Sequence, residues 1–185
     1  MKKCILSFVA IAGILLILNQ SLSAQEEQSA SKVFYTELGG GGIIMSMNFD
    51  QRFTPNSKVG FGYRIGVGFG IGEFEGNYTN QWGWMEYETK TYYSIPVGLN
   101  YVFGNPRSAA SFEVGGGATF LTRKIPYTLG LYYDGEPGNV IGYLTFMFRA
   151  VPANGGFSFR GGFTPIINPG GNLVPMGAIS FGYAF

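Results

Sequence analysis

Histidine is absent from the 185-residue chain, and Cys4 is its only cysteine. An imidazole has the unperturbed pKa best suited to proton transfer near neutral pH, so the usual general base is missing. Neither a Ser-His pair nor, once an N-terminal segment containing Cys4 is removed, a cysteine nucleophile can be assembled. Disulfides and cysteine-based metal sites are excluded for the same reason. We therefore expect no enzymatic activity, no metal site and no cofactor.

Charged residues are also scarce, at 12% of the chain, and the formal net charge is only +1. Removal of Lys2 and Lys3 with the N-terminal segment changes that charge to −1. This balance gives no indication of nucleic-acid binding. Beyond residue 24 no apolar run reaches about 18 residues, so we expect no membrane-spanning helix.

The N-terminus has the pattern of a secretory signal peptide. Lys2 and Lys3 precede an apolar run from Cys4 to Leu18, and a short polar stretch leads to Ala24, with cleavage expected before Gln25. The alternative is a membrane-anchor helix, but the run is shorter than the roughly 20 residues that span a bilayer. We expect residues 1–24 to be a signal peptide, 25–31 a short polar leader and 32–185 the folded domain.

Glycine and aromatic residues are abundant, and they alternate. The segment VGFGYRIGVGFGIG, from Val59 to Gly72, places bulky apolar groups on one face of a strand and only glycines and Arg64 on the other. Such a strand turns its apolar face to lipid and its glycines to the lumen of a barrel. In hydrocarbon every backbone N–H and C=O must be paired within the protein, which without helices requires a closed sheet.

The same alternation recurs eight times along the chain and predicts an all-β fold. The expected fold is an eight-stranded antiparallel up-and-down transmembrane β-barrel with both termini in the periplasm, because short turns alternate with long loops. A tight turn is expected at Gly39–Gly42, and a bulge or bend at Pro96 and Pro165, which lack a backbone donor. The expected strands are residues 34–39, 45–53, 59–72, 93–103, 112–120, 144–150, 157–164 and 179–185.

Three segments, MGAISFGYAF at the C-terminus, IPVGLNYVFG and GFSFRGGFTPI, together with the alternating strands, resemble small outer-membrane β-barrel domains of Gram-negative bacteria. The resemblance covers the chain after the signal peptide and implies location in the outer membrane. It also implies that the last strand is the signal read by the barrel-assembly machinery, through Ile179, Phe181, Tyr183 and Phe185. It implies no catalytic motif.

Charged residues at inward-facing positions predict an ion-pair layer in the lumen. The functional interpretation is a gate or a selectivity ring, and the structural one is a plug in which each buried charge is paired. An eight-stranded barrel is just wide enough for its own side chains, which favours the plug, although the lumen glycines could leave room for water above the layer. The residues are Glu37, Asp50, Arg52, Arg64, Glu113, Arg149 and Arg160.

The segment Glu73–Thr89 is expected to be a long external loop with both tryptophans of the protein. It is either a binding surface or an aromatic belt with a solvated hairpin tip. A hairpin turning at Asn80 and Gln81 would pair Glu73 with Glu88 and Glu75 with Glu86, a register that conflicts with the facing of the adjoining strands unless a bulge intervenes. The candidate binding residues are Glu73, Glu75, Tyr78, Trp82, Trp84, Glu86 and Glu88.

These patterns favour a non-enzymatic outer-membrane barrel with a filled lumen and external loops for surface interaction or envelope structure. Its expected partners are outer-membrane lipid and an unidentified surface ligand, with no nucleic acid. A narrow porin-like channel for ions or small molecules is the alternative. A soluble secreted barrel with an apolar cavity is a third, but a face of glycine and arginine would make a poor soluble coat.

Overall fold

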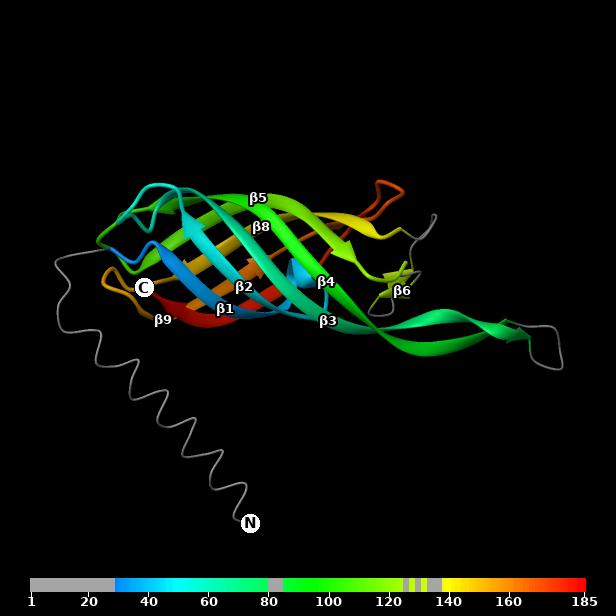
Figure 1. The fold of residues 1–185 in the computed structure, drawn as a ribbon. Helices are drawn as coiled ribbons and strands as arrows, with labels where there is room; N and C mark the ends of the chain where they lie inside the picture. Colours follow the sequence, from blue (N-terminus) through cyan, green and yellow to red (C-terminus); the bar gives the residue numbers. More distant parts are fainter. Residues whose placement is uncertain (1–28, 80–84, 125–126, 129–130, 133–137) are drawn as a thin grey trace, which may run out of the picture.

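The computed structural model describes residues 29–79, 85–124, 127–128, 131–132 and 138–185 (Figure 1). The expected signal peptide, residues 1–24, and most of the expected leader lie outside these ranges. Within them, no helix is long and apolar enough to cross a membrane.

Eight antiparallel strands close into a barrel, as the sequence predicts. Each strand pairs with its neighbours in chain order; β1 pairs with β12 and β8 pairs with β9, which completes the ring. The hairpin formed by the last two barrel strands continues past Pro165 and Pro175 as the short strands β10 (Ile166–Ile167) and β11 (Leu173–Val174). A separate two-stranded sheet is formed by β6 (Tyr127–Thr128) and β7 (Leu131–Tyr132). The barrel strands are β1 (Lys32–Gly39), β2 (Met45–Arg52), β3 (Gly60–Thr79), β4 (Met85–Gly104), β5 (Ala110–Leu121), β8 (Val140–Ala150), β9 (Gly156–Phe163) and β12 (Gly177–Ala184).

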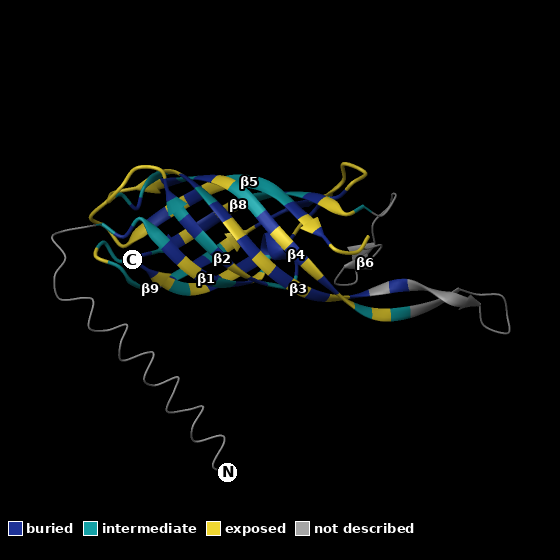
Figure 2. Ribbon diagram, viewed as in Figure 1, coloured by how far each residue is buried: buried dark blue, intermediate teal, exposed yellow. Residues whose placement is uncertain are grey.

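Buried and exposed residues alternate along the barrel strands (Figure 2). The exposed positions carry large apolar side chains, among them Phe61, Val67 and Leu99, each more than 60% exposed. The buried positions point into the lumen, where Glu37 and Asn48 are completely enclosed. This inverted distribution confirms the predicted facing, because a barrel in water would place its polar side chains outside.

The two ends of the barrel differ. One, here named the terminal end, holds the start of the described chain at Ser29, the C-terminus and the short connections 53–59, 105–109 and 151–155 (Figure 1). The other, here named the loop end, holds the long connections and the β3–β4 hairpin, which projects well beyond the barrel wall. The predicted alternation of short turns and long loops holds for the connections 122–139 and 164–176, whereas β1–β2 and β3–β4 are joined at the loop end by only five residues each. The described chain starts and ends on the side of the short turns, as predicted.

The described parts of the segment Glu73–Thr89, residues 73–79 and 85–89, are strand and not loop, contrary to prediction. β3 continues to Thr79 and β4 starts again at Met85, and the expected turn at Asn80 and Gln81 lies outside the described residues. Glu73 pairs with Thr89 and Glu75 with Tyr87, so the predicted Glu73–Glu88 and Glu75–Glu86 pairs are wrong by one residue. As far as Glu75 the hairpin keeps the register that Ile65 and Val97 hold within the barrel, because a one-residue slip would turn every side chain to the opposite face. Between Glu75 and Thr79 the register shifts, and Thr79 pairs with Met85.

Neither Pro96 nor Pro165 shifts the register, so of the predicted bulge or bend the bulge is wrong at both positions. The pairing of β3 with β4 is interrupted around Pro96 and resumes at Gly68 and Ser94 in the same register. At Pro165 strand assignment breaks between β9 and β10, while the Pro165 carbonyl still accepts a hydrogen bond from the Leu144 N–H at 2.9 Å. A proline loses its donor and keeps its acceptor, so the ladder is interrupted without being displaced.

The connection between β1 and β2 folds into the barrel. Residues Gly40–Gly42 form a short 3-10 helix, η1, and these glycines and Ile43 are buried inside the lumen (Figure 1). The Gly41 carbonyl accepts a hydrogen bond from Thr119 Oγ1 at 2.6 Å, and the Gly42 carbonyl accepts one from Ser94 Oγ at 3.2 Å. The tight turn predicted at Gly39–Gly42 is therefore an inserted segment that other strands hold in place.

Candidate functional site

The structure brings all seven predicted charged residues together in the lumen. They come from six strands, β1, β2, β3, β5, β8 and β9, and none is more than 2% exposed. Each lies at an inward position of its strand, so the period-two alternation alone delivers them to the interior. We refer to this set, Glu37, Asp50, Arg52, Arg64, Glu113, Arg149 and Arg160, as the ion-pair layer.

Within the layer acidic and basic groups alternate in one continuous chain, and an arginine stands at each end. The closest N–O distances are 2.7 Å for four of its six contacts, 3.3 Å for Arg149–Asp50 and 3.7 Å for Arg160–Glu37. Every carboxylate therefore contacts two guanidinium groups. The order is Arg64, Glu37, Arg160, Glu113, Arg149, Asp50 and Arg52.

Neutral polar groups complete the coordination of the carboxylates. Asn100 Nδ2 donates to Asp50 at 2.6 Å and to Glu113 at 3.4 Å, and the Asn100 side-chain oxygen accepts from Arg52. Ser180 Oγ donates to Glu37 at 3.2 Å. Asn100 is inward-facing in the sequence pattern, but only the closed barrel shows that it joins two acids. With this many donors around each carboxylate, the layer lacks a free carboxyl group for acid–base chemistry.

The inward glycines of β3 make room for large side chains from neighbouring strands. A Cβ at Gly62 would lie 2.3 Å from Arg52 Cζ, and a Cβ at Gly70 would lie 2.4 Å from the hydroxyl end of the Tyr92 ring. Such separations are far below van der Waals contact. The space that the sequence left open for water above the layer is thus taken up, at these positions, by side chains.

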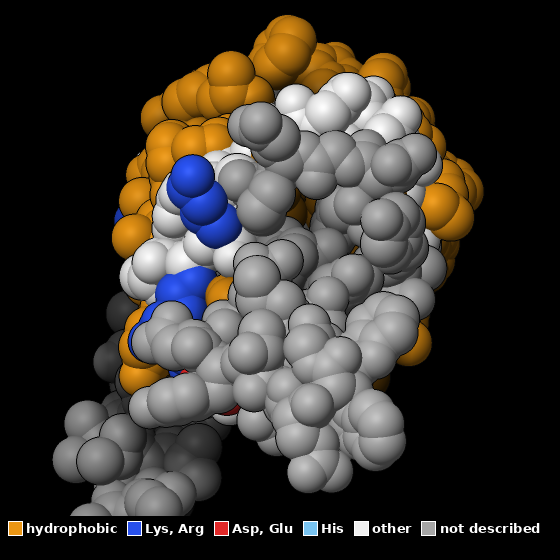
Figure 3. Space-filling model, turned by 90° about the vertical axis from the view of Figure 1, so that its right-hand side faces the viewer, with side chains coloured by type: hydrophobic (Ala, Val, Ile, Leu, Met, Phe, Trp, Pro, Cys, Tyr) orange, Lys and Arg blue, Asp and Glu red, His pale blue; other side chains and the backbone are white. Residues whose placement is uncertain are grey.

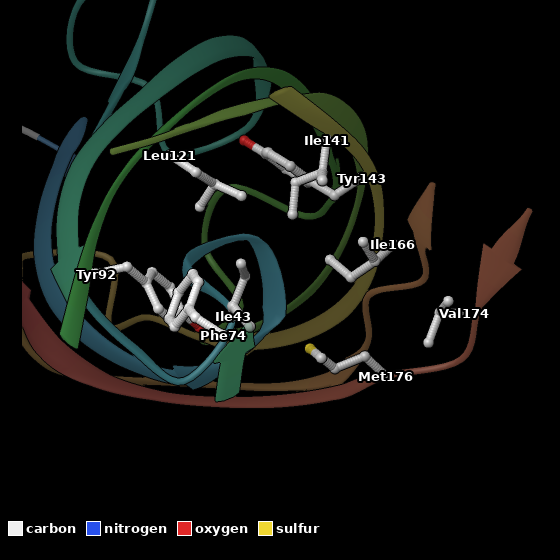
Figure 4. Close-up of a cluster of buried hydrophobic side chains, with 9 residues drawn as sticks. All are labelled: Ile43, Phe74, Tyr92, Leu121, Ile141, Tyr143, Ile166, Val174 and Met176. Carbon is white, nitrogen blue, oxygen red and sulfur yellow. The ribbon is translucent and has the colours of Figure 1, made fainter. Parts of the chain in front are cut away.

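An apolar cluster lies above the ion-pair layer, toward the loop end (Figure 4). Ile43, from the inserted segment, points among side chains that come from the surrounding strands, and Tyr143 joins this cluster to the layer by lying 5.0 Å from Arg64 Cζ. We name this set the apolar cap: Ile43, Phe74, Tyr92, Leu121, Ile141, Tyr143, Ile166, Val174 and Met176.

Ile43 adopts a backbone conformation that β-branched residues rarely take. Its φ of 74° and ψ of −74° define a γ-turn, closed by a hydrogen bond from the Ile44 N–H to the Gly42 carbonyl at 3.2 Å. Such a conformation costs about 1–3 kcal/mol and persists only when its surroundings hold it. The Ile43 side chain is 1% exposed, and its burial contributes a comparable stabilisation of about 1.5–3 kcal/mol.

The terminal end is closed by Lys58 and the N-terminal backbone. Lys58 is only 4% exposed, and its Nζ donates to the Val151 carbonyl at 2.7 Å and to the Ser108 carbonyl. Burial, with Arg149 nearby, lowers the pKa of the Lys58 ammonium below its usual value. The Ala30 N–H donates to the Ala153 carbonyl at 2.9 Å. Sequence reasoning missed Lys58, because a lone lysine in a short turn carries no periodic signal.

Part of the predicted external binding surface lies outside the described structure. Trp82 and Trp84 fall in the undescribed tip, and for Glu73, Glu75, Tyr78 and Glu86 the structure fixes only their place on the β3–β4 hairpin. Glu88 is half-exposed and pairs with Lys90 at 2.7 Å. Among the described residues no group of three or more acidic, histidine or cysteine side chains could hold a metal ion.

The residues of the expected assembly signal lie on the outside of β12. Ile179, Phe181 and Tyr183 are each about half exposed, and Phe185 follows the strand at 56% exposure. Seen from the loop end, hydrophobic side chains follow much of the outer wall of the barrel (Figure 3).

Comparison with known proteins gives the fold but no family. No protein-family model and no curated protein matches the chain. Among solved structures, the N-terminal β-barrel domain of Pseudomonas aeruginosa OprF is similar at 10% identity with a TM-score of 0.50, covering 87% of this chain and 100% of that domain. This similarity agrees with the eight-stranded closed barrel described above.

Two structures of the Yersinia pestis outer membrane protein Ail are also similar. The first, in a phospholipid bilayer nanodisc, has 11% identity and a TM-score of 0.46, covering 85% of this chain and 99% of that one. The second, with the heparin analogue sucrose octasulfate, has 13% identity and a TM-score of 0.40, covering 84% and 95%.

Proposed function

We propose that the protein is a non-enzymatic, integral outer-membrane β-barrel that does not conduct ions and that presents its loop end, above all the β3–β4 hairpin, outside the cell. In this proposal the chain is exported through a cleaved signal peptide and inserted by the barrel-assembly machinery. Its role is surface interaction or envelope structure. The observation that carries the proposal is an apolar outer wall around a lumen occupied along its length.

The outer wall supports a membrane location. Large apolar side chains, about half exposed or more, lie on every barrel strand, including Phe34, Phe112 and Phe146. Closure of the sheet leaves no free strand edge within the barrel, which hydrocarbon requires. A water-soluble protein rarely exposes apolar patches of more than a few hundred Å², so lipid is the partner that this surface fits.

Three successive layers support a closed lumen. Lys58 and Ala30 close the terminal end, the ion-pair layer fills the interior beyond them, and the apolar cap with the inserted segment lies toward the loop end. A hydrated ion would have to displace the buried Ile43 and then separate carboxylates from arginines. Separating buried charges from their partners is strongly unfavourable, which opposes steady permeation.

The test is the electrical conductance of the purified protein in planar lipid bilayers. Folding is verified beforehand by the heat-modifiable gel band, whose mobility changes when heating unfolds the barrel. We expect no reproducible stepwise current from the wild-type protein. The variant Ile43→Gly keeps the inserted backbone and removes the side chain at the centre of the apolar cap; its current should stay absent too, because the ion-pair layer remains. If the wild-type protein gives a clear current and Arg64→Gln changes the ion selectivity of that current, the closed-barrel proposal is wrong and the narrow-channel alternative is supported.

A further inference from the structure

The ion-pair layer holds more positive than negative charge. Four guanidinium groups face three carboxylates, and Glu37, Asp50 and Glu113 are the buried acidic residues of the described chain. All seven side chains are at least 97% enclosed, so bulk solvent does not screen the excess. Lys58, which is also basic, can only add to this excess of positive charge. An uncompensated charge in such surroundings is strongly unfavourable, and proteins pair or neutralise it.

Among the four arginines of the layer, Arg160 donates the fewest hydrogen bonds. Arg52, Arg64 and Arg149 each donate at least three hydrogen bonds, whereas Arg160 donates one, from Nη2 to Glu113 at 2.7 Å. Its Nη1 lies 3.7 Å from Glu37, beyond hydrogen-bond distance, and among the described residues neither Nη1 nor Nε has a hydrogen-bond partner. Arg160 is 1% exposed, so water outside the barrel does not reach these donors.

Two residues near this arginine carry buried hydroxyl groups without hydrogen-bond partners among the described residues. Ser158 stands two positions earlier on the inward face of β9, and Tyr35 lies with its ring 4.3 Å from Arg160 Cζ. Within the described chain neither Ser158 Oγ nor the Tyr35 hydroxyl has a hydrogen-bond partner, and both residues are 1% exposed. A guanidinium can only donate, and both hydroxyls can donate. What this corner of the lumen lacks is an acceptor.

We propose that the lumen binds one small inorganic anion, of the size and charge of chloride, at Arg160, with the hydroxyls of Ser158 and Tyr35 as further donors. A water molecule would accept these hydrogen bonds but would leave the charge uncompensated. A lipid phosphate cannot reach Arg160 through the wall, since its side chain is enclosed. The anion site does not depend on whether the barrel conducts, and it adds a ligand that the proposed function does not require.

The first test measures stability against anion identity. The folded barrel in a non-ionic detergent is unfolded by urea at constant ionic strength, with sodium gluconate progressively replaced by sodium chloride. Gluconate is too large for the site, so the unfolding midpoint should rise with chloride and then follow the dependence expected for one bound ligand. An identical midpoint in chloride and gluconate would overturn the proposal.

The second test locates the ion. Crystals grown from sodium bromide should show an anomalous peak in contact with the Arg160 guanidinium. A map with no lumen peak, or with bromide only on the exposed surface, refutes the site.

A pair of matched variants separates the site from general stability. Ser158→Ala removes a hydroxyl without a partner and should weaken the apparent chloride affinity about tenfold, the loss of one hydrogen bond to a charged group. Ser180→Ala removes a buried hydroxyl already bonded to Glu37, so it should lower the midpoint at every chloride concentration and keep the chloride dependence. Equal chloride dependence in both variants would overturn the assignment of Ser158. Because both changes are small, neither should prevent folding, and the wild-type bromide map remains decisive in any case.

Discussion

Replacing Arg64 by alanine should destabilise the folded barrel strongly. The substitution leaves Glu37 completely buried, with one hydrogen bond from Ser180 and a distant contact to Arg160 at 3.7 Å. Leaving one member of a buried ion pair without its partner typically costs about 3–5 kcal/mol. With a urea dependence of about 2 kcal/mol per molar, the unfolding midpoint should fall by about 1.5–2.5 M. The assay is equilibrium urea unfolding in detergent or lipid, in which the folded fraction is monitored as the intensity of the heat-modifiable gel band.

Arg107→Ala is the matched control, because Arg107 is exposed in the short β4–β5 turn. An exposed arginine contributes about 0–1 kcal/mol, so this midpoint should move by less than about 0.5 M. The double variant Arg64→Met with Glu37→Gln removes both charges and should recover most of the loss, since apolar or neutral replacement of a whole buried pair is often nearly neutral. If Arg64→Ala shifts the midpoint no more than Arg107→Ala, the ion-pair layer does not stabilise the barrel and the reasoning fails.

Three further predictions concern packing, orientation and assembly. Gly70→Ala should destabilise the barrel by about 1–3 kcal/mol in urea unfolding, because the new Cβ would lie 2.4 Å from the Tyr92 ring. Gly177→Ala is the control: its Cβ would have its nearest contact at 3.7 Å, so the free energy of unfolding should change by less than about 1 kcal/mol. Equal effects of the two variants would contradict the proposed packing. In a chain whose one native cysteine, Cys4, lies in the expected signal peptide, Trp82→Cys should react with an impermeant reagent on intact cells and Asn105→Cys should not. The reverse pattern would invert the orientation. Deletion of Phe185 should slow assembly and lower the amount of heat-modifiable folded barrel at native expression; an unchanged yield would remove this residue from the assembly signal.

The sequence alone determined the number of barrel strands and the facing of their residues, although it ended β3 too early and started β4 too late. A period-two pattern is local, so a segment such as Val59–Gly72 shows without any partner which side chains meet lipid and which enter the lumen. For the same reason all seven charged residues of the layer could be assigned to the interior. Their positions follow from strand direction and parity, and both can be counted along the chain.

Only the tertiary structure decided which charges meet. Arg149 and Asp50 are 99 positions apart, and their contact depends on how far neighbouring strands are staggered when the sheet closes. The insertion of η1 and the capping role of Lys58 likewise depend on the space left inside the closed ring. As far as Glu75 the hairpin beyond the barrel keeps the register of the strands below it, although its own glutamates suggested another. Local alternation fixes the face of each residue, but closure of the barrel fixes its neighbours, because those neighbours come from strands far apart in the chain.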